Sequence, residues 1–170
     1  MHIKWIGALL VILSCGGLGF YLSFQHRKQE QMLRQLLAAL DFMECELQYR
    51  LTPLPDLCRQ VSGQCWGEMK QLWIRFAEEM ESQISPDVSG CIRRAMAISA
   101  PMPGKTKENL IRLGNILGRF DLEGQIKGLE SVRLGCRKDL TALEANRDNQ
   151  LRSYQTLGLC AGAALAIILI

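Results

Sequence analysis

The sequence has few of the residues that most often carry catalysis or bind zinc. Its two histidines, His2 and His26, both lie at the N-terminal end. No Cys-x-x-Cys spacing occurs among its seven cysteines, Cys15, Cys45, Cys58, Cys65, Cys91, Cys136 and Cys160. A zinc site needs four such ligands at short spacings, and Ser-His-Asp or Cys-His catalysis needs a histidine in the folded domain. We therefore predict no metal site, no cofactor and no enzymatic activity.

The cysteines have a simpler interpretation. Cys45, Cys58, Cys91 and Cys136 lie within or beside stripes of apolar residues. A free thiol behaves as a small apolar group, and unpaired cysteines are common in reducing compartments. The sequence therefore predicts buried thiols in a cytosolic central domain.

The charge balance excludes another class of function. The formal net charge is +3, and it falls to +2 between Gln25 and Ser153 because Lys4 is the only formally charged side chain outside that stretch. A nucleic-acid surface needs clustered Lys and Arg with aromatic platforms. We predict no nucleic-acid partner and no small-molecule substrate, and we interpret the acidic residues Glu78, Glu79 and Glu81 as a solvated helix face.

The N-terminal segment is strongly apolar. Ile3 to Phe24 is long enough, at about 1.5 Å per residue, to cross the hydrocarbon core of a bilayer. The run Ile12-Leu13-Ser14-Cys15 resembles a lipoprotein cleavage box, but the apolar residues continue well beyond Cys15. A signal peptide or lipoprotein would turn polar there. We predict an uncleaved transmembrane helix at residues 1–24.

The C-terminal segment is also apolar and uncharged. Leu157 to Ile170 falls short of the roughly 20 residues of a spanning helix, although Tyr154 to Thr156 can extend it into the interface. A buried C-terminal helix is the alternative. We predict a second transmembrane helix at residues 154–170.

Basic residues near the two apolar segments predict their orientation. His26, Arg27, Lys28 and Arg34 follow the first segment, and Arg147 and Arg152 precede the second, whereas Lys4 alone lies on the other side. Under the positive-inside rule the domain 25–153 faces the cytoplasm.

The central domain has helical periodicity throughout. No segment shows sustained period-two alternation, so the fold class predicted is all-α, a small helical bundle flanked by the two transmembrane helices. The apolar stripes are Leu33, Leu36, Leu37, Leu40, Met43 and Leu47; then Met69, Leu72, Trp73, Phe76 and Met80; then Val88, Cys91, Ile92, Ala95 and Met96; then Leu110, Leu113, Ile116 and Leu117; and finally Ile126, Leu129, Val132, Cys136, Leu140 and Leu143.

Capping and breaking residues separate these stripes. We expect Thr52 to cap a short helix opened by Pro53 or Pro55, since each proline lacks an amide hydrogen. Ser85-Pro86 predicts a further helix start, and Thr106 is a candidate cap for the next helix.

The stretch GNILGRFDLEGQIKG, from Gly114 to Gly128, admits three interpretations. A phosphate loop needs a preceding strand, which the helical spacing before it argues against. A membrane dimerisation motif does not suit a soluble domain. We predict a helix-turn-helix corner, in which Gly118 ends one helix in the left-handed conformation and Asp121 caps the next, while Gly124 and Gly128 mark a close approach to a neighbouring helix.

Three features together resemble the stage III sporulation protein AB family of endospore-forming bacteria. The first is Leu36 to Leu40 followed by Met43 to Tyr49 and Leu51 to Pro55. The second is Leu113 to Asp121 followed by Gln125. The third is the plan of one apolar helix at each end of a helical domain. The motif positions, structural or partner-contacting, are Thr52, Pro53, Leu54, Pro55, Gly114, Leu117, Gly118, Arg119, Asp121 and Gln125.

The resemblance implies a non-enzymatic, membrane-anchored component of the secretion-like stage III A channel between mother cell and forespore. The family's soluble domain is similar to the inner-membrane platform proteins of type II secretion and type IV pilus machines, which contact a hexameric ATPase. By analogy the partners expected are the sporulation ATPase, protein AA, and the other stage III A subunits, at the mother-cell side of the outer forespore membrane. The alternative is a general secretion-platform protein or lipoprotein without a sporulation role.

Overall fold

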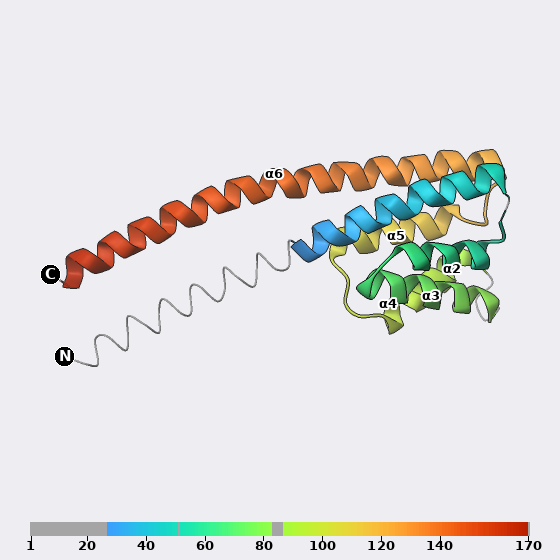
Figure 1. Ribbon diagram of the computed structural model, residues 1–170, viewed down its shortest axis with the longest axis horizontal. Coiled ribbons are helices and arrows are strands. Elements are labelled where there is room, and N and C mark those ends of the chain that lie inside the picture. The colour runs from blue at the N-terminus through green and yellow to red at the C-terminus, as the bar shows by residue number, and fades with distance from the viewer. Residues whose placement is uncertain (1–26, 51, 83–86, 170) are drawn as a thin grey trace. The chain divides into compact units, whose positions relative to one another are not determined.

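The computed structural model describes residues 27–50, 52–82 and 87–169, and for residues 146–169 it describes the backbone alone (Figure 1). Every regular element among the described residues is a helix, which confirms the predicted all-α class. The chain divides into two compact units, one formed by Gln29–Leu140 and the other by residues 1–28 and 141–170. The unit Gln29–Leu140 carries the core and the site.

The unit begins in a helix over residues 27–49, which buries the first predicted apolar stripe except Leu37, which is partly exposed. Leu33, Leu36 and Met43 are fully buried on it. The prolines end this helix as expected, and α2 follows at Leu54–Gln64.

Thr52 does not cap α2, contrary to the sequence prediction. The N-cap is Pro53, whose carbonyl oxygen accepts from the Leu57 amide at 2.9 Å, and Pro55 lies in the first turn. If Thr52 were the N-cap, Pro55 would occupy the N3 position, and proline has no amide hydrogen there for the Thr52 side chain to accept. The Thr52 hydroxyl instead donates to Glu46 Oε2 at 3.0 Å.

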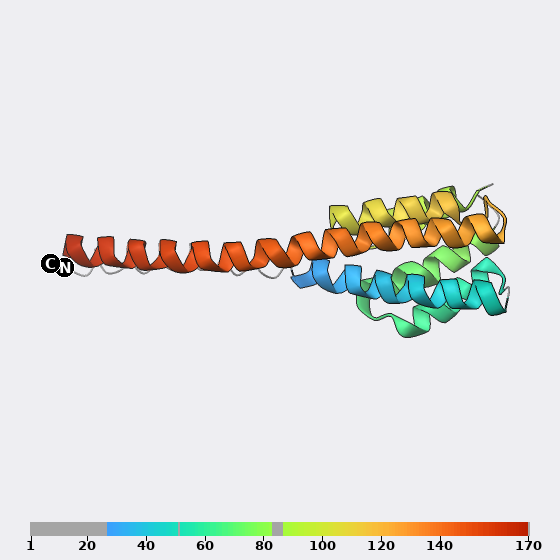
Figure 2. The ribbon, with the colours of Figure 1, turned by 90° about the horizontal axis from the view of Figure 1, so that it is seen from above.

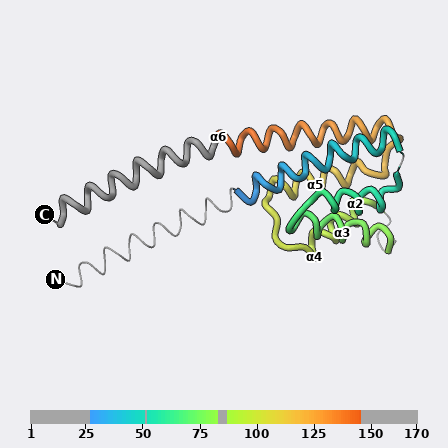
Figure 3. The backbone as a smooth tube through the Cα atoms, viewed as in Figure 1, coloured from blue at the N-terminus to red at the C-terminus, as the bar shows by residue number. Residues whose placement is uncertain are grey.

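Helices α3 (Gly67–Glu81) and α4 (Val88–Ile98) supply the next two stripes. Trp73 and Phe76 of α3 are fully buried, with ring centroids 6.0 Å apart. The tube in Figure 3 traces α2, α3, α4 and α5, in which α2 packs against α3, α3 against α4 and α4 against α5. The predicted start at Ser85-Pro86 lies outside the described residues.

Helix α5 spans Gly104–Ile116, with Pro103 as its N-cap. The prediction that Thr106 caps this helix is wrong. The Pro103 carbonyl accepts from the Lys107 amide at 3.0 Å, so the helix begins before Thr106, whose side chain is fully buried in the first turn. Pro103 therefore marks the start of α5 in place of Thr106.

Helix α6 spans Leu122–Leu169, and its first part, to Leu140, belongs to the same unit (Figure 2). Arg133 of α6 pairs with Asp41 at 3.2 Å and Glu44 at 2.8 Å on the 27–49 helix. Toward α5, buried Asn109 donates to Asp139 Oδ2 at 2.9 Å. These polar contacts and the buried residues Leu129, Val132 and Cys136 fix this part of α6 against the bundle.

The predicted membrane segments stay predictions. Residues 1–24 lie outside the described residues, and the C-terminal segment is described only as helical backbone to Leu169. Within the described part of the chain, no helix combines the length and the apolar character needed to cross a membrane.

Candidate functional site

A groove lies where the start of α4 meets the end of α5. Its volume is about 370 Å³, and we call it the corner groove. It is lined by Asp87, Val88, Ser89, Gly114, Asn115, Leu117, Gly118 and Arg119. Four of the predicted motif positions therefore share one surface feature.

Two glycines of this stretch allow α4 and α5 to approach closely. A Cβ on Gly114 would lie 2.4 Å from Cγ2 of Ile92 in α4. A Cβ on Gly118 would lie 2.8 Å from Cγ2 of Val88. Gly118 also has φ of 72°, which confirms the predicted left-handed termination of α5. Larger residues at either position would separate the walls of the groove.

The first motif stretch reaches the same corner. Cδ1 of Leu54, in the first turn of α2, lies 3.3 Å from the position of a Cβ on Gly118. Pro53 and Pro55 flank Leu54 in sequence at the start of α2. Two stretches that are distant in sequence therefore form one packed corner.

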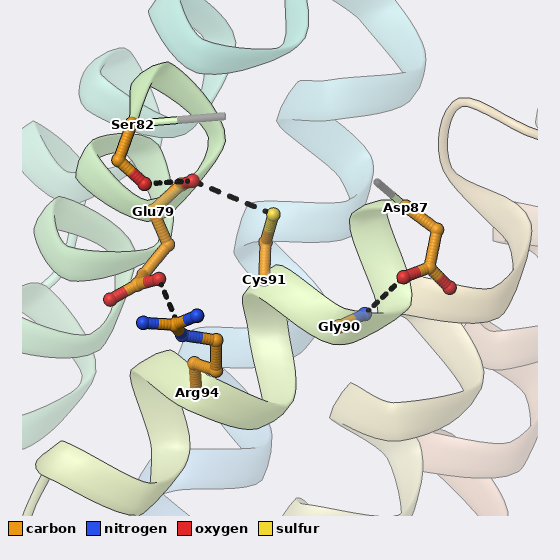
Figure 4. A network of polar contacts seen from close by, with 6 residues as sticks. All are labelled: Glu79, Ser82, Asp87, Gly90, Cys91 and Arg94. Atoms are coloured by element: carbon orange, nitrogen blue, oxygen red, sulfur yellow. Dashed lines mark hydrogen bonds and ion pairs between the residues drawn. The ribbon is translucent and has the colours of Figure 1, made fainter. Parts of the chain in front are cut away.

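The α4 wall of the groove carries a fixed carboxylate. Asp87 is the N-cap of α4, and its Oδ1 accepts from the Gly90 amide at 3.1 Å (Figure 4). The Ser89 hydroxyl donates to the other carboxylate oxygen. The Ser89 hydroxyl and then the Gly90 amide hold the pKa of Asp87 below its usual range, so this wall presents a negative charge at neutral pH.

A polar network joins α3 to α4 beside this wall. The Glu79 carbonyl accepts from the Ser82 hydroxyl at 2.9 Å and from the Cys91 thiol at 3.6 Å (Figure 4). The Glu79 carboxylate, 15% exposed, pairs with Arg94 Nε at 3.0 Å. The predicted solvated acidic face is thus wrong for Glu79, because the packing of α4 covers it. The network positions the start of α4, and with it Asp87.

The opposite wall continues into the turn between α5 and α6. Arg119 is exposed there and Phe120 is 52% exposed. Asp121 Oδ1 accepts from the Gly124 amide at 3.1 Å, which confirms its predicted capping role. Gln125 Nε2 donates to the Phe120 carbonyl at 2.8 Å, and this bond fixes the turn that presents Arg119.

The two later glycines differ in role. A Cβ on Gly128 would lie 2.2 Å from Cγ2 of Ile116, so α6 approaches α5 closely there, as predicted. A Cβ on Gly124 would instead meet Asp121 and Phe120, each at 2.8 Å. Gly124 therefore makes room for the turn before α6 and not for a neighbouring helix.

The cysteines do not form a reactive or metal-binding site in the described residues, where no group of three metal-ligating side chains occurs. Burial raises the pKa of Cys65 to about 11 and that of Cys136 to about 12, and burial also raises the pKa of Cys58 and Cys91. These thiols stay protonated and unreactive at neutral pH. The prediction that Cys45 is buried is wrong, because it lies on the exposed face of the 27–49 helix.

The sequence interpretation missed Asp87 and Ser89. The available signal was an Asp immediately before Val88, the first residue of an apolar stripe, which is the usual position of an N-cap. The helix start was instead predicted at Ser85-Pro86, just before Asp87. The groove that these residues share with Gly114 and Arg119 depends on packing between helices, so no local pattern could indicate it.

Comparisons with known proteins agree with the motif resemblance. The family model for stage III sporulation protein AB (spore_III_AB) matches residues 4–170. Stage III sporulation protein AB of Bacillus subtilis (strain 168) is 22% identical over 169 residues, which cover 98% of this chain and 99% of that protein. A solved structure of stage III sporulation protein AB (SpoIIIAB) has a similar fold, with a TM-score of 0.62 and 21% identity, over 72% of this chain and 98% of that one. Because the family model spans nearly the whole sequence, the chain belongs to the stage III sporulation protein AB family, a family of sporulation proteins.

Proposed function

We propose that this chain is a non-enzymatic, membrane-anchored scaffold of the secretion-like channel complex formed between mother cell and forespore during sporulation. Its helical domain docks the cytoplasmic ATPase, protein AA, and contacts other stage III A subunits. Family membership supports the sporulation role. The analogy with secretion platform proteins supports an ATPase as partner.

The observation that carries the docking role is the convergence of motif residues at the corner groove. Gly114, Leu117, Gly118 and Arg119 line it, and Leu54 packs beneath it. The groove presents an anionic wall at Asp87 and a cation at Arg119, and the exposed ring of Phe120 follows Arg119 in the adjoining turn. Aromatic and arginine side chains at a rigid surface are typical anchors of protein interfaces.

The apolar terminal segments support membrane attachment. Residues 1–24 and 154–170 hold one charged side chain, Lys4, whereas basic residues lie just inside both segments. This distribution favours both chain ends on the far side of the membrane and the domain 25–153 in the mother-cell cytoplasm.

Membrane attachment can be tested in sporulating cells. A fluorescent fusion is expected at the engulfing septum, and mass spectrometry is expected to find an N-terminus without lipid on Cys15. A diffuse fluorescent signal would reject anchoring. A lipidated Cys15 would support the lipoprotein alternative instead.

Docking of the ATPase is tested by pull-down with the full chain in detergent. Arg119→Glu reverses the charge at the groove and is expected to weaken retention of the ATPase about tenfold or more. Lys127→Glu is the control, because Lys127 is 73% exposed on α6 and outside the groove. If wild type retains no stage III A protein, the docking role is wrong. If Arg119→Glu and Lys127→Glu retain the ATPase equally well, the ATPase binds a surface other than the corner groove.

A further inference from the structure

A second groove lies on the same helix pair, toward the end of α4 and the start of α5. Its volume is about 520 Å³. The residues that line it are Arg93, Met96, Ala97, Pro101, Met102, Lys107 and Ile111. None of them lines the corner groove, and we call this surface the methionine groove.

The floor of the methionine groove is apolar and adaptable. Met96 of α4, Met102 of the connection and Ile111 of α5 are each partly exposed. Ile98, the last residue of α4, is also an exposed apolar side chain, at 60%. Methionine side chains are flexible and polarizable, so they adapt to different apolar groups of a partner.

The backbone around this floor is held in place. The Arg75 guanidinium of α3 donates to the Ile98 carbonyl at the end of α4. Pro101 and Pro103 restrict the backbone of the connection, and Pro103 starts α5. The groove is therefore a feature of the fixed backbone, while its methionines supply the adaptability.

Two cations stand at the rim of the groove. Arg93 and Lys107 are exposed, and within the described residues neither side chain forms an ion pair or a hydrogen bond. The charge of Arg93 also helps to lower the pKa of Asp87. The neighbouring cations differ, because Arg94 pairs with Glu79 at 3.0 Å and Lys105 pairs with Asp139 at 3.7 Å. The positive charge at this rim is therefore available to a partner.

We propose that the methionine groove docks an acidic amphipathic helix of a partner protein. An apolar side chain of that helix lies on Met96, Met102 and Ile111, and its carboxylates pair with Arg93 and Lys107. Such helices dock into apolar grooves through residues spaced three and four apart. This interface is separate from the corner groove and does not depend on ATPase docking there.

The charge pattern favours a protein over an anionic membrane as the occupant. Recognition of anionic lipid by electrostatics takes a cluster of about four to eight Lys and Arg. Here two rim cations, Arg93 and Lys107, form no ion pair within the described part of the chain, and the adjacent Lys105 and Arg94 are paired with Asp139 and with Glu79. Two separated cations around an apolar floor fit two carboxylates on one face of a helix.

The proposal is tested with the full chain in detergent and three fluorescent peptides of one length, built from Leu with Glu, Gln or Lys at the polar positions. The Leu/Glu peptide is expected to bind saturably, and at least about tenfold more tightly than the Leu/Gln or Leu/Lys peptide. The double variant Arg93→Glu/Lys107→Glu is expected to lose this binding and to bind the Leu/Lys peptide instead. Lys70→Glu, an exposed position on α3, is the control and should bind as wild type does.

Several outcomes would overturn the proposal. Equal binding of all three peptides, or binding that the double variant leaves unchanged, would show that Arg93 and Lys107 are not the recognition groups. Arg93-dependent binding to vesicles of anionic lipid without peptide binding would identify a membrane as the occupant. Self-association that Met102→Ala abolishes, measured by sedimentation, would identify a second copy of this chain. The double variant is expected to retain the ATPase at the wild-type level. This result would distinguish a failure of the methionine groove from a failure of docking at the corner groove.

Discussion

The two grooves on the α4–α5 pair are built in different ways. At the corner groove, glycines bring the helices together, and the carboxylate of Asp87 is fixed by hydrogen bonds. At the methionine groove, flexible side chains cover the floor, and the side chains of Arg93 and Lys107 form no ion pair or hydrogen bond among the described residues. One helix pair thus presents a rigid surface at one end and an adaptable surface at the other.

This difference predicts how each end responds to substitution. A rigid corner transmits any change in volume to the packing of the bundle, since interiors are close-packed. An exposed groove with unpaired cations contributes little to folding. Substitutions at the corner should therefore change stability, whereas those at the methionine groove should change binding alone.

The largest effect is expected at Gly118. Gly118→Val places a branched side chain at φ of 72°, 2.8 Å from Val88. The strain and overpacking together are expected to destabilise the chain by about 2 to 4 kcal/mol, measured by urea denaturation of the full chain in detergent. Gly63→Ala is the control, because Gly63 has open space around its Cα, and it should stabilise by about 0.4 to 1 kcal/mol. Equal stability of Gly118→Val and wild type would contradict the rigid corner.

The close approach of α4 and α5 at Gly114 and Ile92 can be tested by substituting the two residues singly and together. Gly114→Ala is expected to destabilise by about 1 to 2 kcal/mol, since overpacking against Ile92 exceeds the gain in helix propensity. In an Ile92→Ala background the clashing methyl is absent, and Gly114→Ala should then be neutral or stabilising. A double-mutant cycle measures this coupling, and additive effects would mean that the contact at 2.4 Å does not limit the packing.

A smaller loss of stability is expected from the cap of α6. Asp121→Ala removes the acceptor for the Gly124 amide and should destabilise by about 0.5 to 2 kcal/mol. Asp121→Asn retains an acceptor and should recover most of that loss. If the Ala variant has an unchanged melting temperature but loses complex formation, Asp121 acts as a partner contact and not as a cap.

The cap of α4 is expected to depend on pH. Because the pKa of Asp87 is held below 3.8 in the folded chain, its contribution is present above that pH and is lost as pH falls through the folded value. The difference in melting temperature between wild type and Asp87→Ala should therefore shrink in acid. A difference that stays constant to low pH would contradict the ionised cap.

The smallest effect on stability is expected at the methionine groove. Arg93→Glu and Lys107→Glu should each leave the free energy of unfolding within about 0.5 kcal/mol of wild type, because both side chains are exposed and form no ion pair with the residues that the structure describes. Urea denaturation beside the Gly118 variant makes the comparison direct. A loss as large as that of Gly114→Ala would mean that this end is also structurally constrained.

The sequence predicted the elements better than their boundaries. Stripes such as Leu33 to Leu47 and Met69 to Phe76 proved to be buried because helical periodicity reports directly on the buried face. Thr52 and Thr106 failed as caps because neighbouring prolines and burial decided where α2 and α5 begin. A local sequence pattern does not show whether a proline or a capping side chain will determine the first residue of a helix.

The candidate site was predictable in part. Gly118 and Asp121 were assigned correctly, since left-handed glycines and N-caps act within a few residues of the chain. Asp87 was missed, and Cys45 proved exposed although it lies beside an apolar stripe. Whether a residue beside a stripe is covered depends on the neighbouring helix.

The sequence by itself determined the all-α class, the helix corner at Gly118 and the family, because each rests on periodicity or on motifs that are local in the chain. The tertiary structure is needed to show that Leu54 meets Gly118, that Asp87 and Arg119 line one groove, and that the Arg93 and Lys107 side chains, beside the methionines, have no ion pair among the described residues. These juxtapositions join residues far apart in sequence. They depend on how closely α4 and α5 pack, and a steric contact of that kind exists only once the chain has folded.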